Sequence, residues 1–302
     1  MRPVAIEVND LHKSYGDRSV LAGVTFAVGQ GEIFGIAGRN GAGKTTTVEI
    51  LQGLRRRDAG GVAVLGFDPA RERRRLSALV GAQLQTSALP DRLRVGEALR
   101  LFARLAGDRV QWRELAREWR LEELLAKQFA TLSGGQRQRL FLALTMVNEP
   151  RLVFLDELTQ GLDPLARRET WQLIERARDR GTTVVLVTHD MDEAERLCDR
   201  VAVLHEGRLV TCGRPVGLVT ALGTVRVRFS SPSGASLGGL TRIPGVSRIG
   251  YDGRMADITA DPVAVVPLAG ELARRELSPA DFTVIRPSLQ DAVVSLLDGG
   301  LR

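Results

Sequence analysis

The stretch that most constrains the fold is "GRNGAGKT", which runs from Gly38 to Thr45. The apolar segment "GEIFGIAG" leads into it and predicts a buried strand, while "KTTTVEILQGL" predicts a helix that follows. A glycine, four residues and then Gly-Lys-Thr is the spacing of a loop that holds phosphate groups between a strand and a helix. A dinucleotide-binding loop fits poorly, because "GAGKTT" lacks the last glycine of that pattern. We therefore expect an α/β domain built around a phosphate site.

This loop is suited to a nucleotide with several phosphates. Its glycines let backbone N–H groups close around phosphate oxygens, and the start of the helix adds partial positive charge. Lys44 is expected to reach the β- and γ-phosphates, and the Thr45 hydroxyl to bind Mg²⁺. Arg39 either adds a charge near the phosphates or points into solvent, and the second is favoured. The expected nucleotide-binding residues of the loop are Gly38, Arg39, Asn40, Gly41, Ala42, Gly43, Lys44, Thr45 and Thr46.

Two later apolar segments end in polar residues that suit hydrolysis. "LVFLDE" ends in Asp156, expected to hold Mg²⁺ through water, and in Glu157, placed to take a proton from an attacking water. Taken alone, acids at a strand end also fit a helix cap, but the upstream phosphate loop favours catalysis. "VTHD" places His189 at the end of the next strand, where it can hydrogen-bond the γ-phosphate and the attacking water. Lys44, Glu157 and His189 are therefore expected catalytic groups.

The apolar pattern also predicts the strands and helices that surround this loop in the first part of the chain. Residues 4–8 and 24–28 alternate like antiparallel strands, and residues from about 91 to 143 show helical apolar spacing. "RLVFLDE" and "TTVVLVTH" read as strands separated by the amphipathic "PLARRETWQLIERARDRG", an alternation that predicts a mostly parallel sheet. "RVAVLHEGRLVTCG" reads as a hairpin that turns at "EGR".

The pattern changes beyond this hairpin. "TVRVRF" and "RMADITA" alternate like strands, and "PVAVVPLAGELARRE" is expected to become helical after Pro267. We expect a first domain over residues 1–220 and a small α+β domain over residues 221–302. No nucleophile, metal cluster or phosphate loop is evident in the second.

Composition narrows the class of protein. No apolar run approaches the roughly 18 to 20 residues that cross a bilayer, and the start reads as a strand rather than a signal peptide, so we expect a cytosolic chain. The net charge of the chain is +6. Nearly all of the chain's basic residues are arginines. The runs "LRRRD" and "RERRRL" either meet an anionic partner or form solvated helix faces, and without interleaved aromatics the second is favoured. Cys198 and Cys212 are expected to be ordinary reduced thiols.

Four motifs in this order carry a family resemblance. "GRNGAGKTT", "LSGGQ", "LVFLDE" and "VTHD" resemble the ATPase subunit of an ATP-binding cassette (ABC) transporter, over residues 4 to about 215. "LSGGQ" is that family's own signature. The resemblance implies an α/β, P-loop NTPase fold: an ABC-type nucleotide-binding domain with a RecA-like core, an antiparallel β subdomain and a helical signature subdomain, followed by the small C-terminal α+β domain.

The resemblance also assigns the signature turn and several further residues. Ser133 is placed to cap a helix, so that its hydroxyl and free N–H groups meet the γ-phosphate of ATP held by a second, facing subunit. Tyr15 matches the aromatic residue that stacks on adenine. Gln85 matches the glutamine that touches Mg²⁺ and the attacking water and is chosen over Gln83 by its distance from "ALPDRLRVGEAL". Asp163 matches the aspartate that crosses the dimer seam. The turn residues expected to contact the facing nucleotide are Ser133, Gly134, Gly135 and Gln136.

The function implied is an ATPase that dimerises on ATP and Mg²⁺, most simply as a homodimer, to drive a separate integral membrane permease. No nucleic acid is expected, and the chain is expected on the cytoplasmic face of the cell membrane. The tail motif "RPSLQDAVVSLL" is similar to bacterial drug-exporter ATPases. The main alternative is a soluble ABC ATPase acting on nucleic acid or ribosomes. Leu158 and Gln160 depart from the family's Pro-Thr-Ser, which also leaves open a regulatory clamp that hardly hydrolyses ATP.

Overall fold

The computed structural model describes residues 3–83, 88–107, 111–231, 237–275 and 281–298. These form two compact units, Met1–Arg214 and Pro215–Arg302, each with its own buried cluster of apolar side chains. Among the described residues, no helix is long and apolar enough to cross a membrane. Cys198 and Cys212 are free thiols, as predicted, and burial raises the pKa of both.

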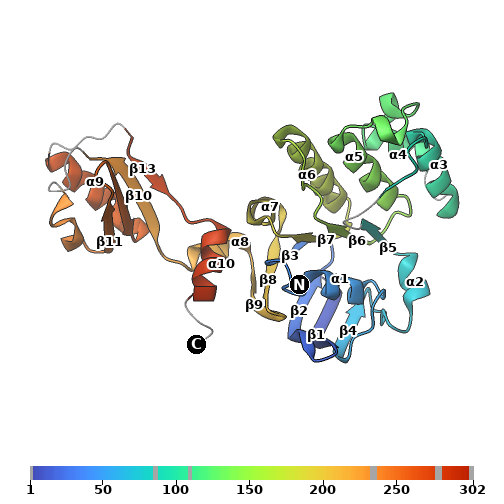
Figure 1. Ribbon diagram of the computed structural model, residues 1–302, viewed down its shortest axis with the longest axis horizontal. Coiled ribbons are helices and arrows are strands. Elements are labelled where there is room, and N and C mark those ends of the chain that lie inside the picture. Colours follow the sequence, from blue (N-terminus) through green and yellow to red (C-terminus); the bar gives the residue numbers. More distant parts are fainter. Residues whose placement is uncertain (1–2, 84–87, 108–110, 232–236, 276–280, 299–302) are drawn as a thin grey trace. The chain divides into compact units, whose positions relative to one another are not determined.

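The first unit contains a parallel sheet with one antiparallel edge strand (Figure 1). Its order is β5-β6-β7-β3-β8-β9, and only β9 runs against its neighbour. The strands β3 and β7 are buried at every position, as expected of a parallel sheet covered on both faces. The bounds are β3 Ile33–Ala37, β5 Val80–Gln83, β6 Leu152–Asp156, β7 Thr183–Thr188, β8 Arg200–His205 and β9 Arg208–Gly213. The predicted parallel sheet and final hairpin are confirmed.

A second sheet of three antiparallel strands packs on the same core. Its order is β2-β1-β4, with β1 at Val4–Tyr15, β2 at Arg18–Gly29 and β4 at Ala59–Val64. Register shifts interrupt the pairing of β1 with β2, for instance between Val8 and Leu11. These irregularities break the alternation of side chains, which explains why the sequence pattern revealed only parts of the first two strands.

Helices complete the first unit, and Figure 1 shows α3 to α6 gathered on one side of the parallel sheet. Their bounds are α1 Lys44–Leu51, α2 Arg73–Ser77, α3 Val95–Leu105, α4 Trp112–Glu118, α5 Gly134–Thr145, α6 Pro164–Asp179 and α7 Met191–Leu197, with 3-10 turns at Glu122–Leu124 and Phe129–Thr131. The helical pattern expected through "WRELAREWRLEELLAK" stops early, because Arg120 has a φ of 52°. This break lets Trp119 and Leu121 both face the core, although they are only two residues apart.

The second unit is a four-stranded antiparallel sheet with helices. The inward side chains of β10, Val225, Val227 and Phe229, alternate with exposed ones, as the pattern predicted. The strand order is β11-β12-β10-β13. The bounds are α8 Pro215–Thr220, β10 Val225–Ser230, β11 Val246–Tyr251, β12 Met255–Ala260, α9 Val265–Arg274, β13 Thr283–Ile285 and α10 Leu289–Asp298, with 3-10 turns at Leu240–Arg242 and Pro262–Ala264.

One boundary in the second unit differs from the prediction. Helix α9 begins at Val265, whereas we expected the helix only after Pro267. Proline is tolerated there because the N–H groups of a first helical turn have no partner within the helix.

Candidate active site

The glycine-rich loop joins the buried strand β3 to helix α1, as the sequence predicts. Gly43 begins the helix with a φ of 100°, and a Cβ atom there would lie 2.6 Å from Leu21 Cδ2 and 2.9 Å from the Val20 carbonyl oxygen. Only glycine avoids both the backbone strain and this overlap. The close approach fixes the loop against β2.

Lys44 lies beneath this loop with only 7% of its surface exposed. Its Nζ donates hydrogen bonds to the carbonyl oxygens of Gly38 at 2.8 Å and Arg39 at 3.1 Å. Burial lowers the pKa of Lys44, while the nearby carboxylates of Glu157 and Asp156 act in the opposite direction. The ammonium is thus held at the loop where phosphate oxygens would lie.

The parallel sheet brings three motifs, the glycine-rich loop, "LVFLDE" and "VTHD", to one edge. Strand β7 lies between β3 and β6, with Ala37 beside Thr188 and Asp156 beside Val187. Because parallel strands end at the same edge, the residues that follow these three strands come together. They border a hollow of about 520 Å³. Its lining residues are Tyr15, Arg18, Val20, Asn40, Gly41, Gly43, Lys44, Thr45, Thr46, Asp156, Glu157, Gln160 and His189.

Glu157 and His189 are in contact at this edge, next to Asp156. His189 Nδ1 lies 2.9 Å from Glu157 Oε1, and the Glu157 N–H donates to the Val187 carbonyl oxygen at 2.9 Å. Glu157 has a φ of 48°, an uncommon conformation for a residue other than glycine and one often found at functional sites. Burial and the neighbouring Glu157 carboxylate raise the pKa of Asp156 to about 6. The site therefore concentrates negative charge that a cation would relieve.

The turn at Ser133 caps helix α5, which confirms the predicted role of this serine as an N-cap. The Gln136 N–H donates to Ser133 Oγ at 3.3 Å, and the Ser133 N–H donates to Gln136 Oε1 at 3.2 Å. Ser133 and Gly134 are exposed. None of the turn's residues is among those that line the 520 Å³ hollow of the same chain.

The start of helix α6 packs beside the turn. A Cβ atom on Gly135 would lie 2.8 Å from Ala166 Cβ, so glycine permits this contact. The Asp163 carboxylate caps α6, accepting hydrogen bonds from the N–H groups of Leu165 and Ala166 at 2.9 Å each. Asp163 and the signature turn thus form neighbouring parts of one exposed surface.

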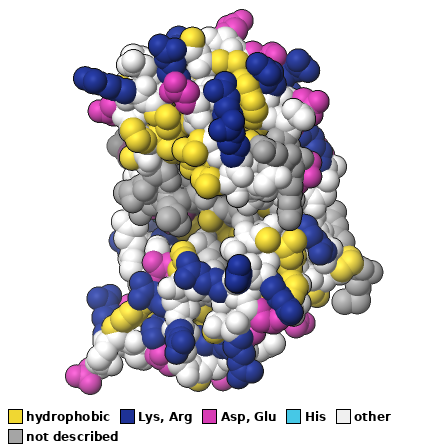
Figure 2. All heavy atoms as spheres, turned by 90° about the vertical axis from the view of Figure 1, so that its right-hand side faces the viewer, with side chains coloured by type: hydrophobic (Ala, Val, Ile, Leu, Met, Phe, Trp, Pro, Cys, Tyr) yellow, Lys and Arg dark blue, Asp and Glu magenta, His cyan; other side chains and the backbone are white. Residues whose placement is uncertain are grey.

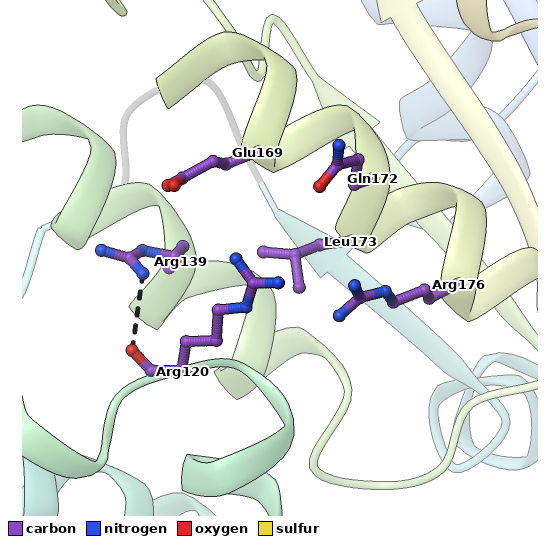
Figure 3. A pocket seen from close by; sticks show the side chains of 6 residues that line it. All are labelled: Arg120, Arg139, Glu169, Gln172, Leu173 and Arg176. Carbon is purple, nitrogen blue, oxygen red and sulfur yellow. Dashed lines mark hydrogen bonds between the residues drawn. The ribbon is translucent and has the colours of Figure 1, made fainter. Parts of the chain in front are cut away.

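A separate hollow lies among α4, α5 and α6, away from the phosphate loop (Figure 3). Arg120, Arg139 and Arg176 converge on it, and Arg139 Nη1 donates to the Arg120 carbonyl oxygen at 3.5 Å. We name these three residues the arginine hollow. Apart from Glu169, no side chain suited to hydrolysis lines this hollow. It is therefore distinct from the candidate active site.

Comparison with known proteins agrees with this geometry. The family model described as "ABC transporter" matches residues 21–160. The chain is 37% identical to the Nod factor export ATP-binding protein I of Rhizobium sp. (strain N33) over 305 aligned positions, covering 98% of each chain. The chain belongs to the ABC transporter ATP-binding family.

Other members of this family are similar in sequence or in fold. The daunorubicin resistance ATP-binding protein DrrA2 of Streptomyces coeruleorubidus is 34% identical over 306 aligned positions, covering 97% of this ABC ATPase and 94% of that protein. A solved ATP-binding subunit of an ABC transporter superposes with a TM-score of 0.64 and 32% identity, covering 72% of this chain and 93% of its own. The predicted family, fold class and ATPase activity are confirmed.

The side of the hollow that Tyr15 lines is aromatic and basic. Tyr15 is 42% exposed, with Lys13 Nζ 5.4 Å and Arg55 Cζ 5.2 Å from its ring centroid. Arg18 pairs with Tyr15 across the turn between β1 and β2 and lines the same hollow. Sequence reasoning missed Arg18 and Val20, although their position just after Tyr15 was a usable signal.

The predicted residue Gln85 of the ABC ATPase lies outside the described residues. Leu158, which replaces the family's proline, is 2% exposed and anchors the loop by burial. Thr159 Oγ1 donates to Glu193 Oε1 at 2.7 Å, and Trp171 Nε1 donates to the same oxygen at 3.3 Å. These contacts fix the backbone after Glu157 without the rigid φ of proline.

Proposed function

We propose that this ABC ATPase works as a homodimer in which the Ser133 turn of each copy completes the nucleotide site of the other. The observation that carries the proposal is the exposed turn with its N-terminal N–H groups, set apart from the chain's own nucleotide hollow. A helix N-terminus of this kind favours an anion. Asp163, exposed beside the turn, belongs to the same proposed interface.

Within one nucleotide site, we propose that the phosphate loop from Gly38 to Thr46 holds the phosphates and that Tyr15 stacks on adenine. Glu157 takes the proton from the attacking water, while His189, 2.9 Å away, orients Glu157 and contacts the γ-phosphate. Lys44 balances charge on the phosphates. Gln85 is proposed to act with them on the attacking water.

The residues present fit Mg²⁺. Thr45 and Asp156 line the same hollow and offer the oxygen atoms that this ion prefers, and Gln85 is proposed as a further ligand. The raised pKa of Asp156 indicates an excess of buried negative charge that a divalent cation would offset. When bound, Mg²⁺ supplies charge neutralisation for the phosphates.

We further propose that closure on ATP drives a separate integral membrane permease from the cytoplasmic face of the membrane. Relatives are named for export of a Nod factor and for resistance to daunorubicin, which supports export of a drug-like or hydrophobic compound. Because these relatives are named for export, nucleic acid is not expected as a partner.

The test is the variant Glu157→Gln, measured by light scattering after size exclusion. With ATP and Mg²⁺ this variant is expected to bind nucleotide, hydrolyse little and elute as a dimer, because the site closes but cannot reset. Adding the substitution Ser133→Arg should return it to monomer while nucleotide binding persists. A Glu157→Gln protein that stays monomeric with saturating ATP and Mg²⁺ would contradict the proposal.

A further inference from the structure

Two arginine-rich segments that the nucleotide site does not require lie together in the first unit. "LRRRD" follows α1, and "RERRRL" leads into and forms most of α2. A Cβ atom on Gly53 would lie 2.4 Å from the Pro69 carbonyl oxygen and 3.4 Å from Arg73 Cγ. The fold therefore brings these segments into contact.

Asp68 connects the two segments. Arg57 donates to its carboxylate through Nη1 at 2.9 Å and Nη2 at 3.0 Å, and Arg71 Nε lies 3.8 Å from the same group. The Asp68 carbonyl oxygen accepts hydrogen bonds from the N–H groups of Arg71 at 3.1 Å and Glu72 at 2.8 Å. The two segments thus form one continuous surface whose arginines are largely exposed to solvent.

This surface carries positive charge that its own acids do not offset. Seven arginines and four acidic residues lie between Glu49 and Arg75. Each acid already has a basic partner: Glu49 with Arg55, Asp58 with Lys13, Asp68 with Arg57 and Glu72 with Arg75. Arg56, Arg73 and Arg74 are exposed, and no ion pair in the described part of the chain involves them.

The surface formed by the two segments is open to solvent and includes an apolar side chain. Two hollows of about 480 and 500 Å³ share Arg71, the first also bordered by Arg56 and the second by Arg74. Leu54, at the start of the first run, is 48% exposed. In Figure 2, Lys and Arg side chains gather over the lower part of the face shown, at the height of α2 in Figure 1.

These features favour one class of anionic partner. Phe67 is the single aromatic residue between Glu49 and Arg75, and it is partly buried, whereas proteins that hold single-stranded nucleic acid stack bases on exposed aromatic rings. Spread arginines beside an exposed aliphatic side chain suit a bilayer surface, where charge and apolar contact act together.

We propose that Leu54, Arg56, Arg71, Arg73 and Arg74, the arginine surface, bind the anionic headgroups of a phospholipid bilayer. This goes beyond the proposed function, in which the chain reaches the membrane only through its permease. Direct contact would hold the ATPase against the membrane independently of nucleotide state.

The test is flotation of the purified 302-residue chain with vesicles of phosphatidylglycerol and phosphatidylcholine, without permease or nucleotide. Each arginine near an anionic surface strengthens binding about fivefold, so the triple variant Arg56→Gln, Arg73→Gln, Arg74→Gln should partition about a hundredfold more weakly. ATP hydrolysis and thermal stability should match the wild type, which keeps this test separate from that of the proposed function.

The matched control removes the three arginines of the arginine hollow, with Arg120, Arg139 and Arg176 each replaced by glutamine. It loses the same charge and should bind vesicles within about twofold of the wild type, because charge outside the contact area is screened. Equal loss in both triple variants, or equal wild-type binding to pure phosphatidylcholine, would overturn the proposal. Binding of a DNA duplex at the same salt, lost in the first variant, would assign the surface to nucleic acid instead and also overturn it.

Discussion

At the scale of single residues, the partly buried Asp156 carboxylate lowers the stability of the folded chain when it is ionised. Burial and Glu157 raise the pKa of Asp156 from an ordinary value of 3.8 to about 6. The folded chain therefore binds a proton there more readily than the unfolded chain does. Its contribution to stability falls as the pH rises from about 4 to about 6 and stays low above that range.

Asp156→Asn is expected to raise the melting temperature of the nucleotide-free protein above pH 6, because position 156 then no longer carries a charge that burial and Glu157 disfavour. The gain should shrink as the pH falls toward 4, where the wild-type carboxyl is already protonated. Melting curves across this range, without Mg²⁺, provide the measurement. An equal gain at pH 4 and pH 8 would show that the substitution acts through packing rather than through ionisation.

The structural features that the sequence predicted correctly are local ones. The strand, loop and helix around Lys44, and the cap at Ser133, each depend on a few adjacent residues, so a short motif specifies them. The contact between Glu157 and His189 depends on two strands that are remote in sequence and parallel in the sheet. Residue spacing suggested their roles, but only the sheet register gives the 2.9 Å contact.

At the scale of elements, the segments that follow Glu157 and His189 are joined through one buried carboxylate. Glu193, on α7, is 1% exposed and accepts hydrogen bonds from Thr159 at 2.7 Å and Trp171 at 3.3 Å. It thereby connects the segment after His189 to the segment after Glu157. The sequence could not reveal this link, since Thr159 and Glu193 are 34 residues apart and only the fold brings them together.

Glu193→Ala is expected to lower the free energy of unfolding by about 2 to 3 kcal/mol, because the buried Thr159 hydroxyl and the half-buried Trp171 N–H lose their shared acceptor. Hydrolysis should fall as well, since both loops lose their shared anchor. Chemical denaturation measures the first effect and phosphate release the second. Asp192→Ala, exposed on the same helix, is the control and should change stability little. A Glu193→Ala protein as stable as this control would contradict the anchoring role.

Elements that the pattern missed have physical reasons to be inconspicuous. Strand β4 is exposed over its first half, and α2 spans only five residues with a single buried leucine, Leu76. Neither element is long or regular enough for its apolar residues to show a periodic pattern. Helix α4 was instead predicted to be too long, because the apolar spacing continues past the break at Arg120. The tertiary contacts of Trp119 and Leu121 outweigh local helix preference there.

At the scale of the whole molecule, the two units have separate cores. The cluster around Val227, Ile258 and Leu268 contains only residues of Pro215–Arg302. The division at Arg214 lies close to the boundary at 220 that the change in sequence pattern suggested. Both units therefore have the internal packing that independent folding requires.

Removal of residues 215–302 is expected to leave a folded protein that binds ATP, because every described residue of the nucleotide hollow lies in the first unit. Circular dichroism and nucleotide titration of the shortened chain test this. The separate segment 215–302 should also show a cooperative unfolding transition. A shortened chain that aggregates or loses its transition would show that the units depend on each other.

A nucleotide site shared between two copies is the central proposal for this protein, and mixing two inactive variants tests it most directly. Lys44→Ala lacks the phosphate ligand, and Ser133→Arg lacks a usable signature turn, so each alone should hydrolyse ATP at a small fraction of the wild-type rate. A mixed dimer contains one site with both Lys44 and Ser133 intact, so equal mixing should restore up to about a quarter of wild-type hydrolysis. Phosphate release from a mixture that stays as inactive as its two components would contradict a shared site.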